Sequence, residues 1–320
     1  MAIKTPVAFF VFNRPETTKR VWAAIRQAAP EKLLIVADGP RHNEEKAKCL
    51  ATRAITEEIN WPCEVTRNYA EKNLGCRQRV SSGLDWVFQN AERAIILEDD
   101  CLPSESFFYF CEELLEKYRT NEKIKQVAGL NTQAGNKKFH CKDSYYFSQI
   151  PQIWGWASWR RAWRNYDVDM NDWPEFKNSE EFKKILPNFS VRQYWQHLWD
   201  HIYQDKNPAT STWDAQWFYA VVKNQGLSIV PQKNLITNIG FSVEATHAKG
   251  SQDEKNNLSR TELTKPFRHP STMAINKQAD DYTWKFVFRI NNSWGKKIRN
   301  WLKQMCPNGY YRLRSWFKAE

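Results

Sequence analysis

An apolar run that ends in three consecutive carboxylates occupies residues 93–100, with the sequence Arg-Ala-Ile-Ile-Leu-Glu-Asp-Asp. Such a run is typical of a strand that is buried on both faces, as in a parallel sheet covered by helices. Open α/β sheets bind ligands at the carboxyl ends of their strands. Because three adjacent acids repel one another, we expect a positive partner, and Mg²⁺ or Mn²⁺ bridging a diphosphate is the obvious candidate. The alternative is an acidic turn that contains a helix cap.

Strand and helix patterns alternate before this run and just after it. Short apolar runs predict strands over 7–12, 33–37, 64–67 and 94–97. Apolar residues at helical spacing predict helices that begin at Pro15, extend over 44–59, and lie around 80–88 and 107–115. This alternation predicts an α/β fold with a doubly wound, mostly parallel sheet.

The sequence after Val127 is irregular and aromatic. We expect a helical region over 179–205, a helix that ends at Lys223, a strand over 227–231 and a polar loop over 250–280. His197 and His201 are four residues apart, but they lack the glutamate of a zinc-binding helix, so we interpret them as exposed. The 16 tryptophans suit either surfaces that stack on sugar rings or an aromatic core.

The seven cysteines are scattered and include no C-x-x-C pair, which argues against a disulfide framework or a zinc site and for a reducing cytosol. The first strand follows the N-terminus directly, so we expect no signal peptide. No apolar stretch reaches the roughly 18 residues that a transmembrane helix needs.

Most of the net charge of +11 lies near the C-terminus, where nine Lys or Arg residues stand against Glu320 from position 284 onward. The rest of the chain is nearly balanced, so we expect no nucleic-acid partner. Trp294, Ile298, Trp301, Leu302 and Met305 have helical spacing, and cations fall mostly on the other faces. This pattern favours a helix that lies on an anionic membrane surface. The alternative is a helix docked on the domain with a solvated basic face.

Several motifs together resemble those of one family. They occur in the order Phe10-Val-Phe-Asn-Arg-Pro-Glu16, Asp38-Gly39, Leu97-Glu-Asp-Asp-Cys-Leu-Pro-Ser-Glu-Ser-Phe-Phe-Tyr-Phe110, Trp154-Gly-Trp156, Trp213-Asp214 and Thr246-His247. The chain is similar to glycosyltransferases of the GT-A fold, most of all to the inverting N-acetylglucosaminyltransferase I family and its bacterial relatives. The resemblance covers about residues 6–250 and departs mostly between 157 and 213, where the acceptor should bind.

The resemblance implies which residues bind the donor. Arg14 and Asp38 match positions that hold uridine diphosphate, and a guanidinium and a carboxylate suit phosphate oxygens and the uracil N–H. Asp100 matches the metal ligand, while Asp99 and Glu98 match residues that bond the ribose and sugar hydroxyls. The alternative for Arg14 and Asp38 is an ion pair or a turn at the strand ends.

The resemblance also implies the catalytic base. Asp214 matches the carboxylate that deprotonates the acceptor hydroxyl, and Trp213 and Trp217 could raise its pKa by desolvation. The alternative is an aspartate that caps a helix. His247 matches a loop histidine that reaches the metal or the diphosphate, although a lone histidine in a polar loop is usually just solvated.

Trp154, Gly155 and Trp156 could pack on the donor or the acceptor, because indole faces stack on sugars and glycine allows close approach of the backbone. Core packing is the alternative for the two indoles.

These expectations combine into one hypothesis. A GT-A domain spans 1–280, with a nucleotide-binding half of about 1–130 and an acceptor half of about 131–280, and a basic tail spans 281–320. The domain transfers a sugar from a nucleotide diphosphate, with Mn²⁺ or Mg²⁺, to a glycan or lipid-linked acceptor at the inner face of the cytoplasmic membrane. The alternatives are a nucleotidyltransferase, which should carry a Gly-rich basic phosphate loop near the N-terminus, and a non-catalytic module that binds sugar or membrane.

Overall fold

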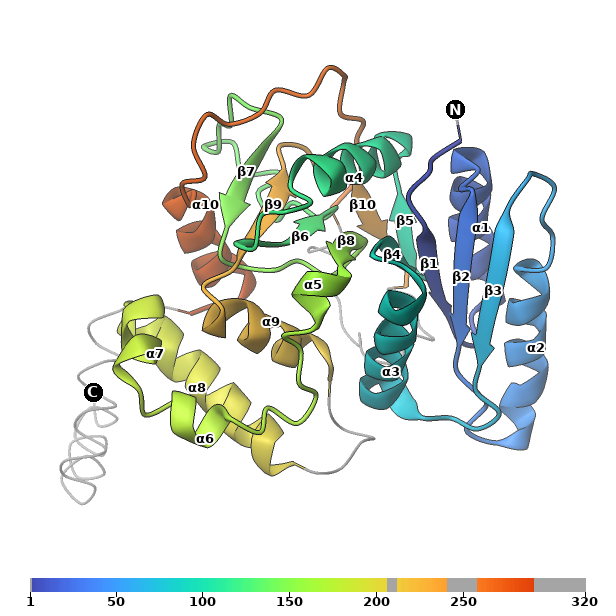
Figure 1. Ribbon diagram of the computed structural model, residues 1–320, viewed down its shortest axis with the longest axis horizontal. Helices are drawn as coiled ribbons and strands as arrows, with labels where there is room; N and C mark the ends of the chain where they lie inside the picture. Colours follow the sequence, from blue (N-terminus) through green and yellow to red (C-terminus); the bar gives the residue numbers. More distant parts are fainter. Residues whose placement is uncertain (1, 206–211, 241–257, 291–320) are drawn as a thin grey trace, which may run out of the picture.

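The computed structural model describes residues 2–205, 212–240 and 258–290 (Figure 1). An eight-stranded sheet with the order β3-β2-β1-β4-β8-β6-β9-β7 fans across the molecule from β3 on the right to β7 on the left. Its strands are β1 (Val7–Val11), β2 (Lys32–Ala37), β3 (Glu64–Tyr69), β4 (Arg93–Glu98), β6 (Ile124–Ala128), β7 (Tyr145–Ser148), β8 (Trp156–Trp159) and β9 (Leu227–Pro231). Only β7 and β8 run antiparallel to their neighbours. The predicted α/β class with a mostly parallel sheet is confirmed.

Helices cover both faces of this sheet. Successive residues of a strand point to opposite faces, so Phe9 of β1 packs in one core and Phe10 in another. The first core includes residues of α1 (Pro15–Ala28) and α4 (Glu105–Lys117), and α2 (Lys46–Ile55) packs on α1. The second includes residues of α3 (Gly75–Asn90), α5 (Arg160–Trp163) and α9 (Asp214–Lys223). This arrangement is the predicted double winding.

A helical layer with a core of its own lies on α9. It consists of α6 (Trp173–Phe176), α7 (Glu180–Ile185) and α8 (Phe189–Gln204). The indole of Trp199 on α8 donates a 2.9 Å hydrogen bond to the carbonyl of Ala215 on α9. Ten of the thirteen tryptophans in the described part of the chain are buried and none is exposed, so the aromatic content serves cores.

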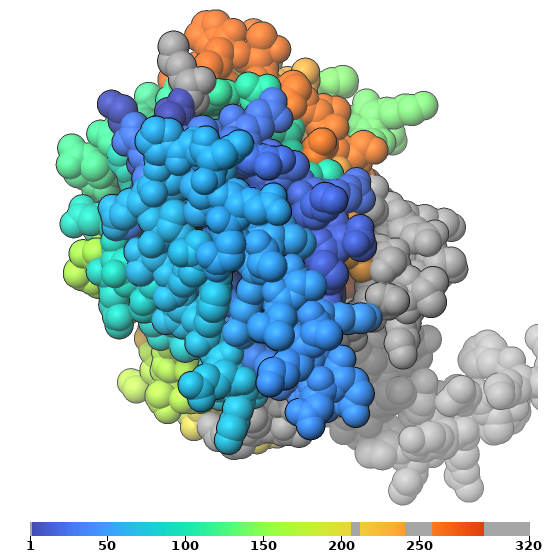
Figure 2. Space-filling model, turned by 90° about the vertical axis from the view of Figure 1, so that its right-hand side faces the viewer, coloured from blue at the N-terminus to red at the C-terminus, as the bar shows by residue number. Residues whose placement is uncertain are grey.

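A small antiparallel sheet borders the end of β4. It pairs β5 (Cys101–Pro103) with β10 (Ile236–Asn238), and Asn238 lies opposite Cys101. β3 forms one edge of the large sheet, and in the view of that side of the molecule residues from the N-terminal part of the chain, in blue, occupy the centre of the surface (Figure 2).

The described start of the basic tail packs on the domain. After α10 (Lys277–Tyr282), a π-helical turn η3 (Thr283–Val287) brings Trp284 into the core of the helical layer, and Ile290 joins it. The predicted helix from Trp294 to Met305 lies outside the described residues, so its place on a membrane or on the domain stays a prediction, as does the division of the chain at 130 and 280.

Some predicted boundaries differ from the observed ones. The helix expected over 44–59 is a 3-10 turn η1 (Asn43–Glu45) followed by α2, which ends at Ile55. The hydroxyl of Thr56 donates to the carbonyl of Arg53 and closes that end. His197 and His201 are exposed on α8, as predicted. The six described cysteines are free, and within the described ranges no helix has the length and hydropathy to cross a bilayer.

Candidate functional site

The three consecutive acids lie at the carboxyl end of β4, beside the ends of β1 and β2. Glu98 is the last residue of β4 and pairs with Phe10 of β1, so the residues after β1 lie next to those after β4. Asp99 and Asp100 form the turn into β5. Parallel strands thus gather their carboxyl ends at one edge of the sheet, where this class of fold binds ligands.

Arg14 is the positive partner that the acids require within the chain. Its Nη1 lies 2.6 Å from Oδ2 of Asp100 and 3.7 Å from Oδ1 of Asp99. Burial alone would lower the pKa of Arg14, but the charges of Asp99 and Asp100 outweigh it and the pKa is raised. Arg14 therefore neutralises part of the acidic cluster, and its predicted contact with a diphosphate would compete with these ion pairs.

Glu98 and Asp99 hold their protons strongly. Burial, followed by the charges of Asp100 and Asp99, raises the pKa of Glu98 to about 8. Burial and Asp100 raise the pKa of Asp99 to about 7, although Arg14 opposes this shift. Asp99 Oδ2 also accepts a 3.0 Å hydrogen bond from the backbone N–H of Phe12, so this acid fixes the chain at the end of β1. Near neutral pH Glu98 is therefore mostly protonated, and a bound cation would favour the ionised forms of both acids.

Asp214, which is more than 110 residues further along the chain, lies near the same acids. It is the first residue of α9, is partly exposed, and its carboxylate accepts a hydrogen bond from the hydroxyl of Thr212. Its charge contributes to the raised pKa of Glu98, which requires the two carboxylates to be near each other. The structure thus brings Asp214 and the acids after β4 together. Asp214 is also the first residue of α9, so the alternative of a structural aspartate at a helix start remains open.

Cys76 lies among these acids and was not singled out from the sequence. It is in the first turn of α3 and has exposed surface, yet protein crowds around it. This desolvation, together with the charges of Glu98 and Asp214, raises the pKa of its thiol to about 12. The sequence feature that could have identified Cys76 is its position just after the turn at Asn73, because α3 begins at the same edge of the sheet as the acids.

Asp38 serves the turn that follows β3. Four donors reach its carboxylate at 2.8–3.2 Å, namely the N–H groups of Gly39, Leu74 and Gly75 and the amide of Asn73. Burial raises the pKa of Asp38 in spite of these donors. The turn alternative therefore holds, and a uracil N–H would have to replace one of the four donors.

Trp156 is a core residue. Its indole has no exposed surface and packs with Trp163, Trp213 and Trp217 in the second core. A side chain without exposed surface cannot stack on a sugar, so the predicted donor contact of this indole is wrong and the core alternative holds. Trp154 is partly buried against the first core.

Gly155 allows close packing against Ile236. Its φ of +59° lies in the left-handed region, and a Cβ there would lie 2.4 Å from Cδ1 of Ile236. Glycine is needed because the side chain of Ile236 on β10 packs at this point. The predicted contact of Gly155 with the donor stays a prediction.

Gly240 makes room for Asp100. A Cβ at this position would lie 2.4 Å from Oδ2 of Asp100, and its N–H donates to Oδ1 of Asn238. This contact was not predicted. His247 lies outside the described residues, so its proposed contact with the metal stays a prediction.

The described residues offer a partial metal site. Among them, no three His, Cys, Asp or Glu side chains converge into a complete cage. Mg²⁺ or Mn²⁺ needs only one or two protein carboxylates when phosphate oxygens and water supply the rest. The side chain of Asp100 keeps 17% of its surface exposed, and a cation there would favour the ionised forms of Glu98 and Asp99, so these residues fit such an ion.

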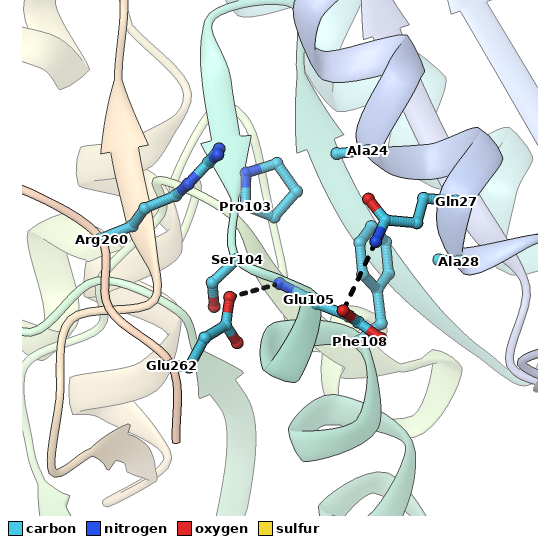
Figure 3. A pocket seen from close by; sticks show the side chains of 9 residues that line it. All are labelled: Ala24, Gln27, Ala28, Pro103, Ser104, Glu105, Phe108, Arg260 and Glu262. Carbon is cyan, nitrogen blue, oxygen red and sulfur yellow. Dashed lines mark hydrogen bonds between the residues drawn. The ribbon is translucent and has the colours of Figure 1, made fainter. Parts of the chain in front are cut away.

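Two cavities in the described part of the chain lie away from the acids. One is bounded by α1, the start of α4 and residues 260–262 (Figure 3). There the carboxylate of Glu262 accepts hydrogen bonds from the N–H groups of Glu105 and Ser106 at 3.1 and 2.8 Å. Glu262, which belongs to another segment of the chain, thus caps α4, so the polar side chain in this cavity has a structural role. The other cavity lies at the start of β4 and is described below.

No protein-family model and no curated protein matches the chain. Among solved structures, a 4-diphosphocytidyl-2C-methyl-D-erythritol synthase from Anaerococcus prevotii is similar at 9% identity and a TM-score of 0.36, over 71% of this chain and 88% of that one. Mouse xyloside xylosyltransferase 1 is similar at 10% identity and a TM-score of 0.32, over 68% and 81%. At these TM-scores the likeness carries no functional argument. The resemblance to N-acetylglucosaminyltransferase I therefore stays a prediction.

Proposed function

We propose that the protein is a metal-dependent glycosyltransferase that moves a sugar from a nucleotide diphosphate, preferably a UDP-sugar, to a glycan or lipid-linked glycan. The observation that carries the proposal is the set of carboxylates at the end of β4 with Asp214 near them. Metal-dependent sugar transfer needs carboxylates that can hold a cation and a further carboxylate that takes the proton of the acceptor hydroxyl.

Asp100 would hold Mn²⁺ or Mg²⁺, together with donor phosphate oxygens and His247. When bound, such an ion offsets the charge that develops on the leaving diphosphate. Arg14 adds a second cation beside Asp100, and its ion pairs keep the carboxylate oriented before the donor arrives. Glu98 and Asp99 would accept from the sugar and ribose hydroxyls.

Asp214 would act as the base of an inverting transfer. Its carboxylate takes the proton of the acceptor hydroxyl as that oxygen attacks the sugar, a role that contributes about 10²–10⁴-fold. The hydrogen bond from Thr212 and the attachment of α9 to two cores keep the carboxylate at a fixed place. Trp213 is buried beside it and shields one side from water.

Bacterial surface polysaccharide or glycoconjugate synthesis at the inner face of the cytoplasmic membrane is the setting we propose. The support is the sequence of the tail, in which cations and tryptophans alternate toward the C-terminus.

The test is turnover of a panel of nucleotide sugars with and without Mn²⁺. Asp100→Ala should abolish metal-dependent donor binding, whereas Asp214→Asn should bind the donor and lose transfer by about 10²–10⁴-fold. Asp281→Asn, the same chemical change at an exposed position, is the matched control.

Three outcomes would contradict the proposal in different ways. No turnover and no Mn²⁺-dependent binding would exclude the enzyme. Full activity of Asp214→Asn would exclude the base or the inverting course. Release of diphosphate from a nucleoside triphosphate would instead support a nucleotidyltransferase, although residues 12–14 after β1 contain no glycine.

A further inference from the structure

Five arginines line one cavity at the other end of the central sheet. The cavity has a volume of about 500 Å³, and its arginines are Arg93, Arg119, Arg160, Arg161 and Arg164. Arg93 begins β4 and Glu98 ends it, so the cavity and the acids lie roughly 16 Å apart at about 3.3 Å per residue. The cavity is therefore separate from the proposed catalytic site.

The fold itself explains two of these arginines. Arg160 donates from Nε to the carbonyl of Phe88, near the end of α3. Arg161 donates to the carbonyls of Tyr118 and Arg119, just beyond the end of α4, and to that of Ile124 at the start of β6. Both side chains cap carbonyl groups that a helix end leaves without partners.

The other three arginines are not needed for such caps. Arg93 and Arg119 share a single carboxylate, that of Glu116, and the side chain of Arg119 is 64% exposed. Arg164 is exposed, and its guanidinium has no hydrogen-bond or ion-pair partner among the described residues. With Glu92 as the only other acid of the lining, three positive charges are in excess.

We propose that this cavity binds a phosphate-bearing anion. Guanidinium groups bind phosphate oxygens through two parallel hydrogen bonds, and their charge does not depend on pH in the physiological range. The volume lies in the range of small-molecule sites and exceeds that of a single inorganic ion, which favours a phosphorylated organic molecule or a lipid headgroup.

Recognition there rests on charge and not on ring stacking. The guanidinium of Arg161 lies 4.3 Å from the ring centroid of Trp159, and the indole is 3% exposed, so no aromatic face remains for a base or a sugar. The class of ligand is thus defined by its phosphate oxygens.

The experiment is a titration of the full chain with pyrophosphate at low salt in EDTA, followed by calorimetry. Arg119→Gln combined with Arg164→Gln should weaken binding by about tenfold or more, because each removes a charged donor. Glu116→Gln should strengthen it, since Arg93 and Arg119 lose their internal partner. Arg26→Gln, an exposed arginine on α1, is the matched control.

A second arm identifies the source of the phosphate. If phosphatidylglycerol vesicles bind the double variant about tenfold or more weakly than the wild type, and phosphatidylcholine vesicles bind neither, the ligand is a lipid headgroup; the tail, unchanged in both proteins, accounts for any remaining binding. Loss of pyrophosphate binding alone indicates a soluble ligand. Absence of saturable binding, or equal binding by the double variant, overturns the proposal. Turnover of nucleotide sugars by the double variant should stay unchanged, which keeps this test independent of the proposed function.

Discussion

Asp280 offers a direct test of how burial controls a charge in this fold. Its carboxylate lies inside the domain, with 3% of the residue exposed. The hydroxyl of Ser148 and the N–H of Gln149 donate to its two oxygens at 2.5 and 3.1 Å. Burial nevertheless dominates and raises the pKa of Asp280 to about 7. We predict that Asp280→Asn stabilises the protein above neutral pH.

The sign and size follow from the raised pKa. The ordinary value is 3.8, so the folded state holds the proton more tightly than the unfolded state. The stability that this proton contributes is complete below about pH 4 and is lost as the pH rises through about 7. At about 1.4 kcal/mol per pKa unit, the charged form costs roughly 4 kcal/mol by pH 8. The asparagine side chain of the variant would keep both hydrogen bonds, because its amide can donate to Ser148 and accept from Gln149.

The assay is thermal unfolding of both proteins at pH 5 and pH 8. At roughly 1–2.5 °C per kcal/mol for a chain of this length, the Asp280→Asn variant should melt roughly 4–10 °C above the wild type at pH 8 and gain much less at pH 5. Asp281→Asn changes the exposed neighbour in the same way and should show no such pH dependence. An equal gain at both values, or a loss at pH 8, would refute burial as the cause.

Three further changes test other parts of the structure. Glu262→Ala removes the cap of α4 and should lower the free energy of unfolding by about 1 kcal/mol in urea titrations. Because the pKa of this exposed acid is lowered in the folded state, the stability that the cap contributes should be lost as the pH falls below 4.5. An unchanged urea midpoint would contradict this role. Gly155→Ala should destabilise the protein by roughly 2 kcal/mol or more. Ile236→Val removes the Cδ1 atom that an alanine Cβ would meet, so the double variant should recover part of this loss. Simple additivity of the two changes would contradict the contact between residues 155 and 236. Asp38→Ala leaves four donors without an acceptor and should cost roughly 2–4 kcal/mol by chemical denaturation, and a neutral effect would mean that the turn does not depend on it.

The sheet could be predicted where its strands are apolar runs between helical patterns. The strand over 227–231 was predicted at its observed bounds, and the run before Glu98 was recognised as a buried strand. β5, β6, β7, β8, β10 and the short helices α5, α6 and α10 were not predicted. They have three to six residues each, and the aromatic pattern of β7 and β8 is the same as that of the neighbouring loops.

The site was predicted in part. The acids after β4 could be found because three like charges at a strand end require a partner. That the partner is Arg14 depends on a contact between residues 86 positions apart, which a local pattern does not contain. The roles of Trp156 and Gly155 were missed for a related reason, since indoles and glycines suit a sugar and a core equally well until the packing is known.

The attachment of α9 to two different cores has a consequence for how this protein can diversify. One side of α9 rests on the sheet that carries the acids, and the other supports the helical layer around Trp199. Substitutions in that outer layer can reshape the surroundings of Asp214 while the β-strand scaffold beneath the acids stays as it is. The geometry around Asp214 can therefore change by drift in α6, α7 and α8, while the strands that carry the acids remain under separate selection.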